Sequence, residues 1–195
     1  MVLDYAIQKL FLLALSSYLI GAIPFSFLIS KIFGGKDIRN YGSGNVGASN
    51  VARVIGVRYG VFALLADVGK GALATILMMQ FNLPLFIGGF AVLGHIFSPF
   101  LKFSGGKGVA TSIGVIAVFS WKTGLALGAI WLITLAIWKI ASLSSLTALT
   151  SSPLLIWIFG KKGPLFYTTI GIALLAYLTH RENISRLIAG KENKI

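Results

Sequence analysis

Glycine, serine and asparagine crowd one short stretch of an otherwise apolar chain. Residues 42–56 read GSGNVGASNVARVIG, with a single charged side chain at Arg53. Asn50 precedes Arg53 by three residues, so the two share a face if a helix begins near Ser49. A guanidinium can hold a phosphate through two parallel hydrogen bonds, and small polar residues add neutral donors beside it. The stretch therefore predicts a phosphate-binding loop, and a plain helix cap at Ser49 or Asn50 is a compatible alternative.

A second glycine-rich stretch, FSGGKGVATS at 103–112, surrounds Lys107. Gly105, Gly106 and Gly108 let the backbone turn with its N–H groups exposed, and we expect a helix to begin directly afterwards with its positive end towards the loop. Together these features predict a nest for an anion. The spacing is not GxxxxGK[ST] and no strand precedes it, so this is not a Walker A loop. A flexible turn whose lysine sets membrane topology is the alternative interpretation.

A third polar stretch, HRENISRL at 180–187, ends the last apolar run. His180 and Asn183 are three residues apart and share a helical face, whereas Glu182 and Arg186 are four apart and can pair on another face. Histidine changes its charge near neutral pH, which makes His180 a candidate general base. The alternative is a residue that only fills space at the membrane boundary.

Two ionisable residues lie inside an expected apolar helix. Asp67 and Lys70 are about 15 to 20 Å from the inner end of that helix if it starts near residue 57. Charges at this depth are costly, so we expect the two side chains to pair inside the bundle. A structural ion pair is favoured over a proton relay, and His95 on the next helix is placed to hydrogen-bond to it.

The composition places these residues in a membrane protein. Of the 195 residues, 56% are hydrophobic and 11% are charged, and the mean hydropathy is +0.88, which is too apolar for a water-soluble domain. About 20 helical residues cross a bilayer core. The sequence therefore predicts one all-α polytopic domain over 1–195 with about seven transmembrane helices. The apolar runs are 8–33, 57–80, 84–101, 108–120, 122–138, 145–159 and 164–178.

Two of these runs are unusual. The first contains Pro24, which predicts a kink because proline lacks the N–H that a helix needs. The fourth, 108–120, would reach only about 20 Å, so its neighbours must shield it and it need not cross the whole bilayer.

Most of the 17 lysines and arginines fall on one side if the N-terminus lies outside. The positive-inside rule then predicts a cytoplasmic C-terminus and brings the three polar stretches, together with ASLSSLT at 141–147, to the cytoplasmic face. The net charge of +12 is thereby explained by topology and anionic lipid, not by nucleic acid.

Several enzyme classes are disfavoured by what the sequence lacks. Its five acidic residues form no close pair of the kind that glycosidases use, and no HExxH or His/Cys cluster suggests a catalytic metal. No GxSxG elbow suggests a serine hydrolase, and the absence of cysteine excludes disulfides. We expect neither metal nor cofactor. A cytoplasm-facing site of amides, hydroxyls, Lys107 and Arg53, walled by apolar helices, suits a molecule with a phosphate head and a fatty tail.

GSGNVGASNVAR, FSGGKGVAT and HRENISRL, in this order, resemble the three signature motifs of the bacterial acyl-phosphate:glycerol-3-phosphate acyltransferase family. The resemblance covers essentially the whole chain in length, number of spans and motif spacing, with Ser49 in place of a threonine. It implies transfer of a fatty acyl group from acyl phosphate to the sn-1 hydroxyl of glycerol 3-phosphate, which gives lysophosphatidic acid and phosphate in phospholipid synthesis. It also implies a location in the bacterial cytoplasmic (inner) membrane.

The resemblance further implies site residues and partners. Its catalytic residues fall on Ser43, Arg53, Lys107, His180 and Asn183. Its substrate-binding residues fall on Asn45, Asn50, Gly105, Gly106, Gly108, Ser145, Asp67 and Lys70. A family glutamate falls on Glu182 or Glu192, and the sequence leaves that choice open. The partners are acyl phosphate, glycerol 3-phosphate and membrane lipid, without coenzyme A or nucleic acid, and a monomer is expected.

We expect direct transfer, because acyl phosphate is already an activated mixed anhydride. The site must align a hydroxyl about 3 to 3.5 Å from the carbonyl carbon and stabilise charge. Lys107 and the loop amides would neutralise the leaving phosphate, while Arg53, Ser43 and the asparagines hold glycerol 3-phosphate. The proton acceptor stays open between His180 and the substrate's own phosphate, which we favour, and an acyl-serine route through Ser43 is a third option.

Two other functions use the same residues. An organic-phosphate or anion transporter would bind its substrate in the same nests, although transporter sites lie near the midplane between repeats and no repeat is evident here. A membrane scaffold that uses its basic face to hold lipid or a partner is the less specific alternative.

Overall fold

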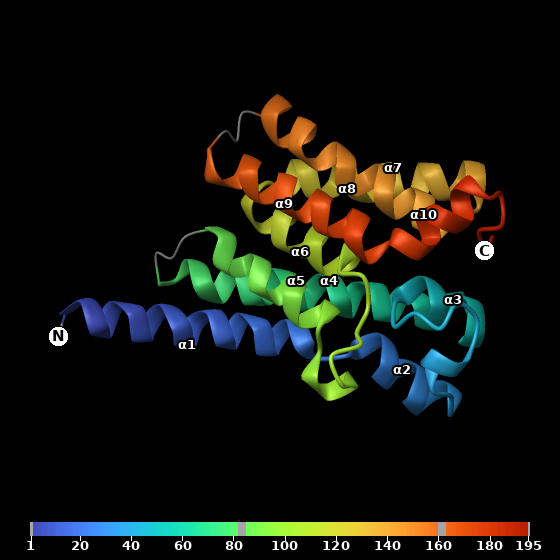
Figure 1. Ribbon diagram of the computed structural model, residues 1–195, viewed down its shortest axis with the longest axis horizontal. Coiled ribbons are helices and arrows are strands. Elements are labelled where there is room, and N and C mark those ends of the chain that lie inside the picture. The colour runs from blue at the N-terminus through green and yellow to red at the C-terminus, as the bar shows by residue number, and fades with distance from the viewer. Residues whose placement is uncertain (1, 82–84, 160–162, 195) are drawn as a thin grey trace.

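The computed structural model describes residues 2–81, 85–159 and 163–194, with side chains for 7–81, 87–159 and 163–194. All regular elements of these residues are helices, as Figure 1 shows. In chain order they are α1 (Val2–Ala22), α2 (Phe25–Gly34), η1 (Ile38–Asn40), α3 (Ala48–Ile55), α4 (Val57–Met79), η2 (Leu85–Gly88), α5 (Gly89–Ile96), η3 (Pro99–Leu101), α6 (Val109–Phe119), α7 (Trp121–Trp138), α8 (Ala141–Ile158), α9 (Pro164–Thr179) and α10 (Arg181–Ile188). The predicted all-α class is confirmed.

Apolar helices of two lengths make up the body. Four stretches within the described residues are long and apolar enough to cross a bilayer, namely Ile7–Gly34, Val57–Met79, Trp121–Trp138 and Ala141–Ile158. Three further apolar stretches are shorter, namely Gly89–Leu101, Val109–Phe119 and Pro164–Thr179. The seven predicted runs therefore correspond to apolar helical stretches, but the count of seven crossings stays a prediction.

The predicted kink at Pro24 is a complete break between α1 and α2. The last carbonyls of a helix lack intrahelical partners, and two side chains from elsewhere supply them here. Ser98 Oγ donates to the carbonyl of Ala22 at 2.6 Å, and Lys70 Nζ donates to the carbonyl of Ile23 at 2.7 Å.

The predicted Asp67–Lys70 ion pair forms, with 2.8 Å between Lys70 Nζ and Asp67 Oδ1. On the far side of the break, Ser26 Oγ donates to Asp67 Oδ2 at 2.9 Å. Asp67, Lys70 and Ser26 are all buried. The pair therefore attaches both α1 and α2 to α4, which is a structural role.

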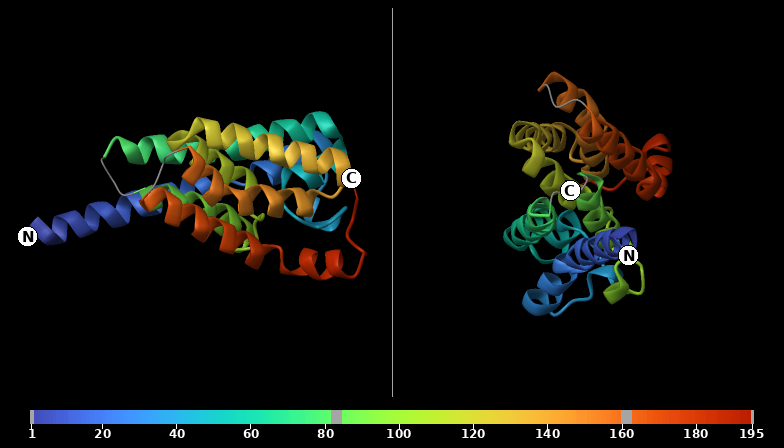
Figure 2. Two further views of the ribbon diagram at one scale, coloured as in Figure 1. Left: turned by 90° about the horizontal axis from the view of Figure 1, so that it is seen from above. Right: turned by 90° about the vertical axis from the view of Figure 1, so that its left-hand side faces the viewer.

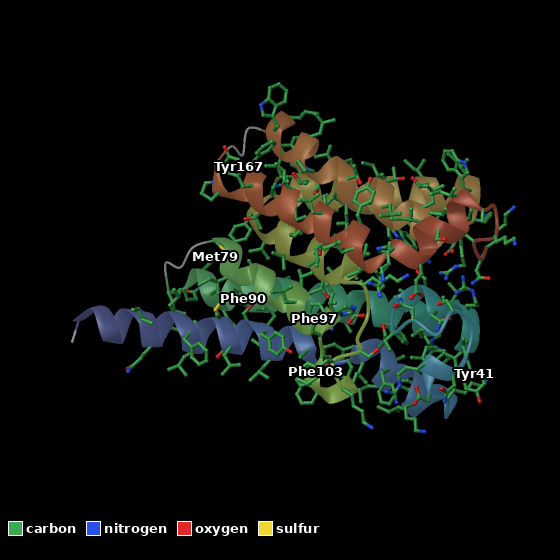
Figure 3. All side chains as sticks on the ribbon, viewed as in Figure 1. Tyr41, Met79, Phe90, Phe97, Phe103 and Tyr167 are labelled. Atoms are coloured by element: carbon green, nitrogen blue, oxygen red, sulfur yellow. The ribbon has the colours of Figure 1, made fainter. Side chains whose placement is uncertain are left out.

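The predicted helix over 84–101 is wrong at its inner end, while residue 84 lies outside the described residues. Helix α5 stops at Ile96, and the chain turns into η3, because a residue before proline, here Ser98, disfavours helical backbone. Lys102 and Phe103 then adopt left-handed φ angles of 53° and 60°. Figure 3 shows Phe97 and Phe103 at this turn.

Helix α8 begins earlier than predicted. The expected start was residue 145, but the helix runs from Ala141, so the serines of 141–147 belong to its first turns and not to a loop. Ser144 and Ser145 each donate to the carbonyl four residues earlier, which satisfies their hydroxyls within the helix.

The short helix α6 is shielded as the sequence requires. It packs against α4, α7, α5 and α9, and its 11 residues span about 16 Å. Glycines bring α4 and α6 into close contact: a Cβ on Gly71 would lie 2.3 Å from the carbonyl oxygen of Thr111, and one on Gly114 would lie 2.1 Å from that of Val68.

The two termini lie at opposite ends of the long axis, as Figures 1 and 2 show. Helices α2, α3 and α10 gather at the C-terminal end. Figure 3 shows the nitrogen and oxygen atoms concentrated near Tyr41 at that same end. The first polar stretch and α10 therefore share one end of the molecule, whereas Phe103, which begins the second stretch, lies nearer the middle of the long axis.

Replacing Gly71 by alanine is expected to destabilise the fold by about 1 to 3 kcal/mol, because the added methyl group overlaps the backbone of α6. Gly69→Ala is the matched control on the same helix, since its Cβ would meet nothing within 4 Å. Thermal unfolding in detergent measures both. Equal midpoints for the two variants would contradict this account of the α4–α6 contact.

Candidate active site

One cavity of about 260 Å³ receives residues from all three polar stretches. The first stretch contributes Ser43, Asn45, Gly47, Ala48, Ser49, Asn50 and Arg53. The glycine-rich loop and α6 contribute Lys107, Gly108, Val109, Ala110 and Ile113, and the C-terminal region contributes His180, Asn183, Glu192 and Asn193. The three stretches that the sequence predicts to meet thus line the same cavity.

The side chain of Asn50 holds the first polar stretch together through hydrogen bonds. Its side-chain oxygen accepts hydrogen bonds from Ser43 N at 2.9 Å and from Arg53 Nη1 at 3.4 Å. Its amide nitrogen lies 3.0 to 3.2 Å from the carbonyls of Ile38, Tyr41 and Asn45. Asn50 is 1% exposed, and its hydrogen bonds hold Arg53 and the loop backbone in place.

The alternative interpretation, a helix cap at Ser49 or Asn50, is wrong. Helix α3 begins at Ala48 after Gly47, and no side chain caps its first turn. The expectation that Asn50 and Arg53 share a helical face is confirmed by their hydrogen bond.

The glycine-rich loop is fastened to the end of α5. Gly105 N donates to the carbonyl of Ile96 at 2.9 Å, and Gly106 N donates to that of His95 at 3.1 Å. A Cβ on Gly105 would lie 2.0 Å from the His95 carbonyl oxygen, and one on Gly106 would lie 2.2 Å from His95 Nε2. The expectation that these two amides are free for an anion is therefore wrong. Neither glycine lines the cavity.

A better candidate for anion binding is the start of α6, directly after this loop. Gly108 precedes α6 with a φ of 80°, a left-handed value that favours glycine. The first N–H groups of a helix have no intrahelical partners, and Val109 and Ala110 of this first turn line the cavity. Lys107 lines it beside them, so the amides at the start of α6 replace those of Gly105 and Gly106 as candidate phosphate ligands.

A chain of polar contacts joins Lys107 to the C-terminal tail. Lys107 Nζ donates to Asn183 Oδ1, and Asn183 Nδ2 donates to Glu192 Oε1. Glu192 also accepts from Ser142 Oγ at 3.0 Å and pairs with Arg186 Nε at 2.7 Å. The glycine-rich loop, α8, α10 and the tail are thereby connected through side chains.

The two candidate glutamates have different surroundings. Glu192 lines the cavity, whereas Glu182 is exposed on α10. The predicted Glu182–Arg186 pair is wrong, because the chain turns back at Gly190, with a φ of 67°, and brings Glu192 to Arg186.

Three ionisable groups of this polar end, Lys107, His180 and Glu192, have shifted pKa values. Burial lowers the pKa of Lys107 to about 8, against the opposing effect of Glu192. Burial and then the charge of Lys107 lower the pKa of His180 to about 4. Burial acts to raise the pKa of Glu192, but hydrogen bonds from Asn183, Arg186 and Ser142 hold it below its usual value. At neutral pH, Lys107 and Glu192 are therefore charged and His180 is neutral.

The tautomer of His180 follows from its surroundings. Its Nδ1 lies 2.8 Å from the carbonyl oxygen of Ala176, which can only accept, so in the neutral ring Nδ1 carries the proton. Nε2 is then the unprotonated nitrogen. The residue is only 2% exposed, although it lines the cavity.

The deep ionic cluster touches the cavity on one side. Asp67 and His95 line it, with 3.6 Å between Asp67 Oδ1 and His95 Nδ1, whereas Lys70 does not. Lys70 points instead to the helix break. His95 was expected only as a partner of this cluster, and its place in the cavity wall follows from where α5 ends.

The other half of the cavity is apolar. Its walls are Leu64, Leu65 and Val68 of α4, Val109, Ala110 and Ile113 of α6, and Gly128, Trp131 and Leu132 of α7. Trp131 Nε1 donates to Ser145 Oγ at 3.1 Å, which joins α7 to α8. Sequence reasoning missed Trp131, because nothing in its local sequence distinguishes it from the other aromatic residues of an apolar helix.

Known proteins resemble this chain in sequence. The family model described as Glycerol-3-phosphate acyltransferase matches residues 11–190. A glycerol-3-phosphate acyltransferase of Dinoroseobacter shibae is 44% identical over 94% of this chain and 92% of its own length. One of Geotalea daltonii is 43% identical over 93% and 95%.

Two solved structures are also similar. The crystal structure of PlsY (YgiH), an integral membrane glycerol 3-phosphate acyltransferase, in its glycerol 3-phosphate form has a TM-score of 0.89 at 38% identity, over 96% of each chain. Its lysophosphatidic acid form has a TM-score of 0.87 at 36% identity, over 96% of this chain and 95% of the other. From sequence and structure together, this chain belongs to the glycerol-3-phosphate acyltransferase family.

Proposed function

We propose that this protein transfers a fatty acyl group from acyl phosphate to the sn-1 hydroxyl of glycerol 3-phosphate, with lysophosphatidic acid and phosphate as products. The observation that carries the proposal is the single cavity with a basic, amide-rich end and an apolar end. Such a cavity suits two phosphates and one fatty chain. The glycerol 3-phosphate and lysophosphatidic acid forms of the similar PlsY structures support the same acceptor and product.

Glycerol 3-phosphate binds beside α3. Arg53 is oriented by Asn50 Oδ1 and lines the cavity together with Ser43 and Asn45. A guanidinium fork with neighbouring hydroxyl and amide donors matches a phosphate dianion. Asn50 acts here through Arg53 and the loop.

Acyl phosphate binds across the start of α6. Lys107 and the free N–H groups of the first turn hold its phosphate, and Asn183 fixes the ammonium of Lys107. The acyl chain lies against the apolar walls from α4, α6 and α7. This arrangement brings the carbonyl carbon between the two phosphate sites, where the sn-1 hydroxyl can attack it directly.

In this mechanism the sn-1 hydroxyl passes its proton to the substrate's own phosphate. The neutral imidazole of His180 has an unprotonated Nε2, but the residue is almost fully buried and bonded through Nδ1 to the backbone, which favours an orienting role. Among the described residues, no imidazole, carboxylate or amine hydrogen-bonds to Ser43 Oγ, as the base of an acyl-serine route would. Direct transfer needs no such base.

The membrane arrangement is part of the proposal. The chain forms one domain over 1–195 and acts as a monomer in the inner membrane, with the N-terminus outside and the cavity at the cytoplasmic end. The positions of the termini at opposite ends of the long axis support an odd number of crossings. The names of the relatives favour acyl transfer over transport of organic phosphate.

Purified protein in detergent, supplied with palmitoyl phosphate and glycerol 3-phosphate, is expected to form lysophosphatidic acid, and a metal chelator is expected not to stop it. Palmitoyl coenzyme A is expected not to replace the acyl phosphate. Chromatography of labelled product measures each case. Uptake of labelled glycerol 3-phosphate by proteoliposomes without any acylated product would instead establish transport.

The rate is expected to fall as the pH rises through about 8, because a pKa of about 8 means that Lys107 loses its positive charge there. In Lys107→Arg the side chain stays charged up to about pH 12. The pH at which the rate falls is therefore expected to be higher in this variant, even if its maximal rate is lower. The pH profile of kcat/KM for acyl phosphate measures both. The same alkaline limb in the two proteins would exclude Lys107 as its source.

Glu192→Gln is expected to lower kcat/KM about tenfold or more, because the carboxylate that accepts from Asn183, Ser142 and Arg186 loses its charge. Glu182→Gln is the matched control, since Glu182 is exposed. Initial rates are measured on proteins with equal melting temperatures. A loss of kcat/KM in the Glu182 variant alone would assign this role to Glu182 instead of Glu192.

A further inference from the structure

We propose that Gly128 determines which fatty chains the protein accepts, because the missing side chain leaves the deep end of the acyl groove open. The acyl groove is the apolar half of the cavity between α4, α6 and α7. This inference rests on the proposed function.

Two glycines on one side of α7 meet different surroundings. Gly124 and Gly128 are one helical turn apart, so they share a face. A Cβ on Gly124 would lie 2.5 Å from Ala117 Cβ, which means that α7 touches α6 at that level. A Cβ on Gly128 would meet nothing within 4 Å, and Gly128 lines the cavity. The two helices therefore separate between these positions, and the space beside Gly128 belongs to the groove.

The depth of Gly128 follows from Trp131. The indole N–H of Trp131 donates to Ser145 Oγ near the start of α8, which fixes the ring next to the polar end of the cavity. Gly128 lies about 4.5 Å further along α7, away from the polar end. A fatty chain whose carbonyl lies near Lys107 thus passes Trp131 before it reaches Gly128.

The opposite walls at this depth are fixed. Val68 of α4 and Ile113 of α6 line the groove, and α6 is held against α4 at the Gly114–Val68 contact. Val68 and Ile113 therefore form one side of the groove at this depth, and Gly128 of α7 lines the groove as well. Because Gly128 presents only hydrogen there, a long straight or cis-unsaturated chain can continue between α4 and α7.

Gly128→Leu is expected to select against long chains. The leucine side chain occupies the space beyond Trp131, so kcat/KM for palmitoyl phosphate falls at least about tenfold relative to octanoyl phosphate, since single methylene groups in apolar pockets already change this ratio by such factors. Gly128→Ala is expected to give a smaller shift in the same direction. The KM for glycerol 3-phosphate stays unchanged, because the phosphate sites are remote from position 128.

Gly69→Leu is the matched control. A Cβ on Gly69 would also meet nothing within 4 Å, but Gly69 does not line the cavity, so its chain-length profile is expected to match that of the native protein. The inference would be overturned if the ratio of kcat/KM for palmitoyl phosphate to that for octanoyl phosphate were the same in the native protein and both Gly128 variants. An equal loss of kcat/KM for the two acyl phosphates gives the same ratio and would overturn it too. Alanine favours helix over glycine, so the Gly128→Ala result stands even if the leucine variant does not fold.

The proposed function fails in a different way. If the native protein forms no lysophosphatidic acid from any acyl phosphate, the reaction itself is refuted. If the native protein is active and the variants keep its chain-length profile, only the role of Gly128 is refuted.

Discussion

Backbone groups inside a bilayer have no water to bond to, so each carbonyl or amide released from a helix must find its partner within the protein. Two interruptions of helices meet this requirement here. Lys70 and Ser98 bond to the carbonyls released at the Pro24 break, and the carbonyls at the end of α5 accept from Gly105 and Gly106. These contacts fix α2 and the glycine-rich loop, which lie beside the two proposed phosphate sites of the cavity.

Charge placement then distinguishes the two ends of the cavity. Asn183 and Glu192 tie Lys107 to the C-terminal tail, while Asn50 ties Arg53 to its loop. Both cations are therefore held in place before any substrate arrives, which lowers the cost of ordering them during the reaction. The apolar end depends on its shape, which comes from the close α4–α6 contact and from the open space beside Gly128 of α7.

Local patterns predicted the helical class, the three polar stretches and the Asp67–Lys70 pair, because each depends on composition or on residues a few positions apart. The free amides of Gly105 and Gly106 were predicted wrongly, since their partners lie on α5. The place of Glu192 in the cavity wall depends on the turn at Gly190, and the position of Trp131 depends on its hydrogen bond to Ser145. Contacts between distant segments were thus not predictable from local sequence patterns. The exception is the meeting of the three polar stretches, which the family resemblance implied.

The central claim is that both substrates occupy one cavity at the same time and react directly. Initial rates measured over a grid of palmitoyl phosphate and glycerol 3-phosphate concentrations test it, because a covalent acyl-protein would separate the two half-reactions. Double-reciprocal lines that intersect are the expected result. Parallel lines, accompanied by a labelled acyl-protein that passes its label to glycerol 3-phosphate, would contradict it.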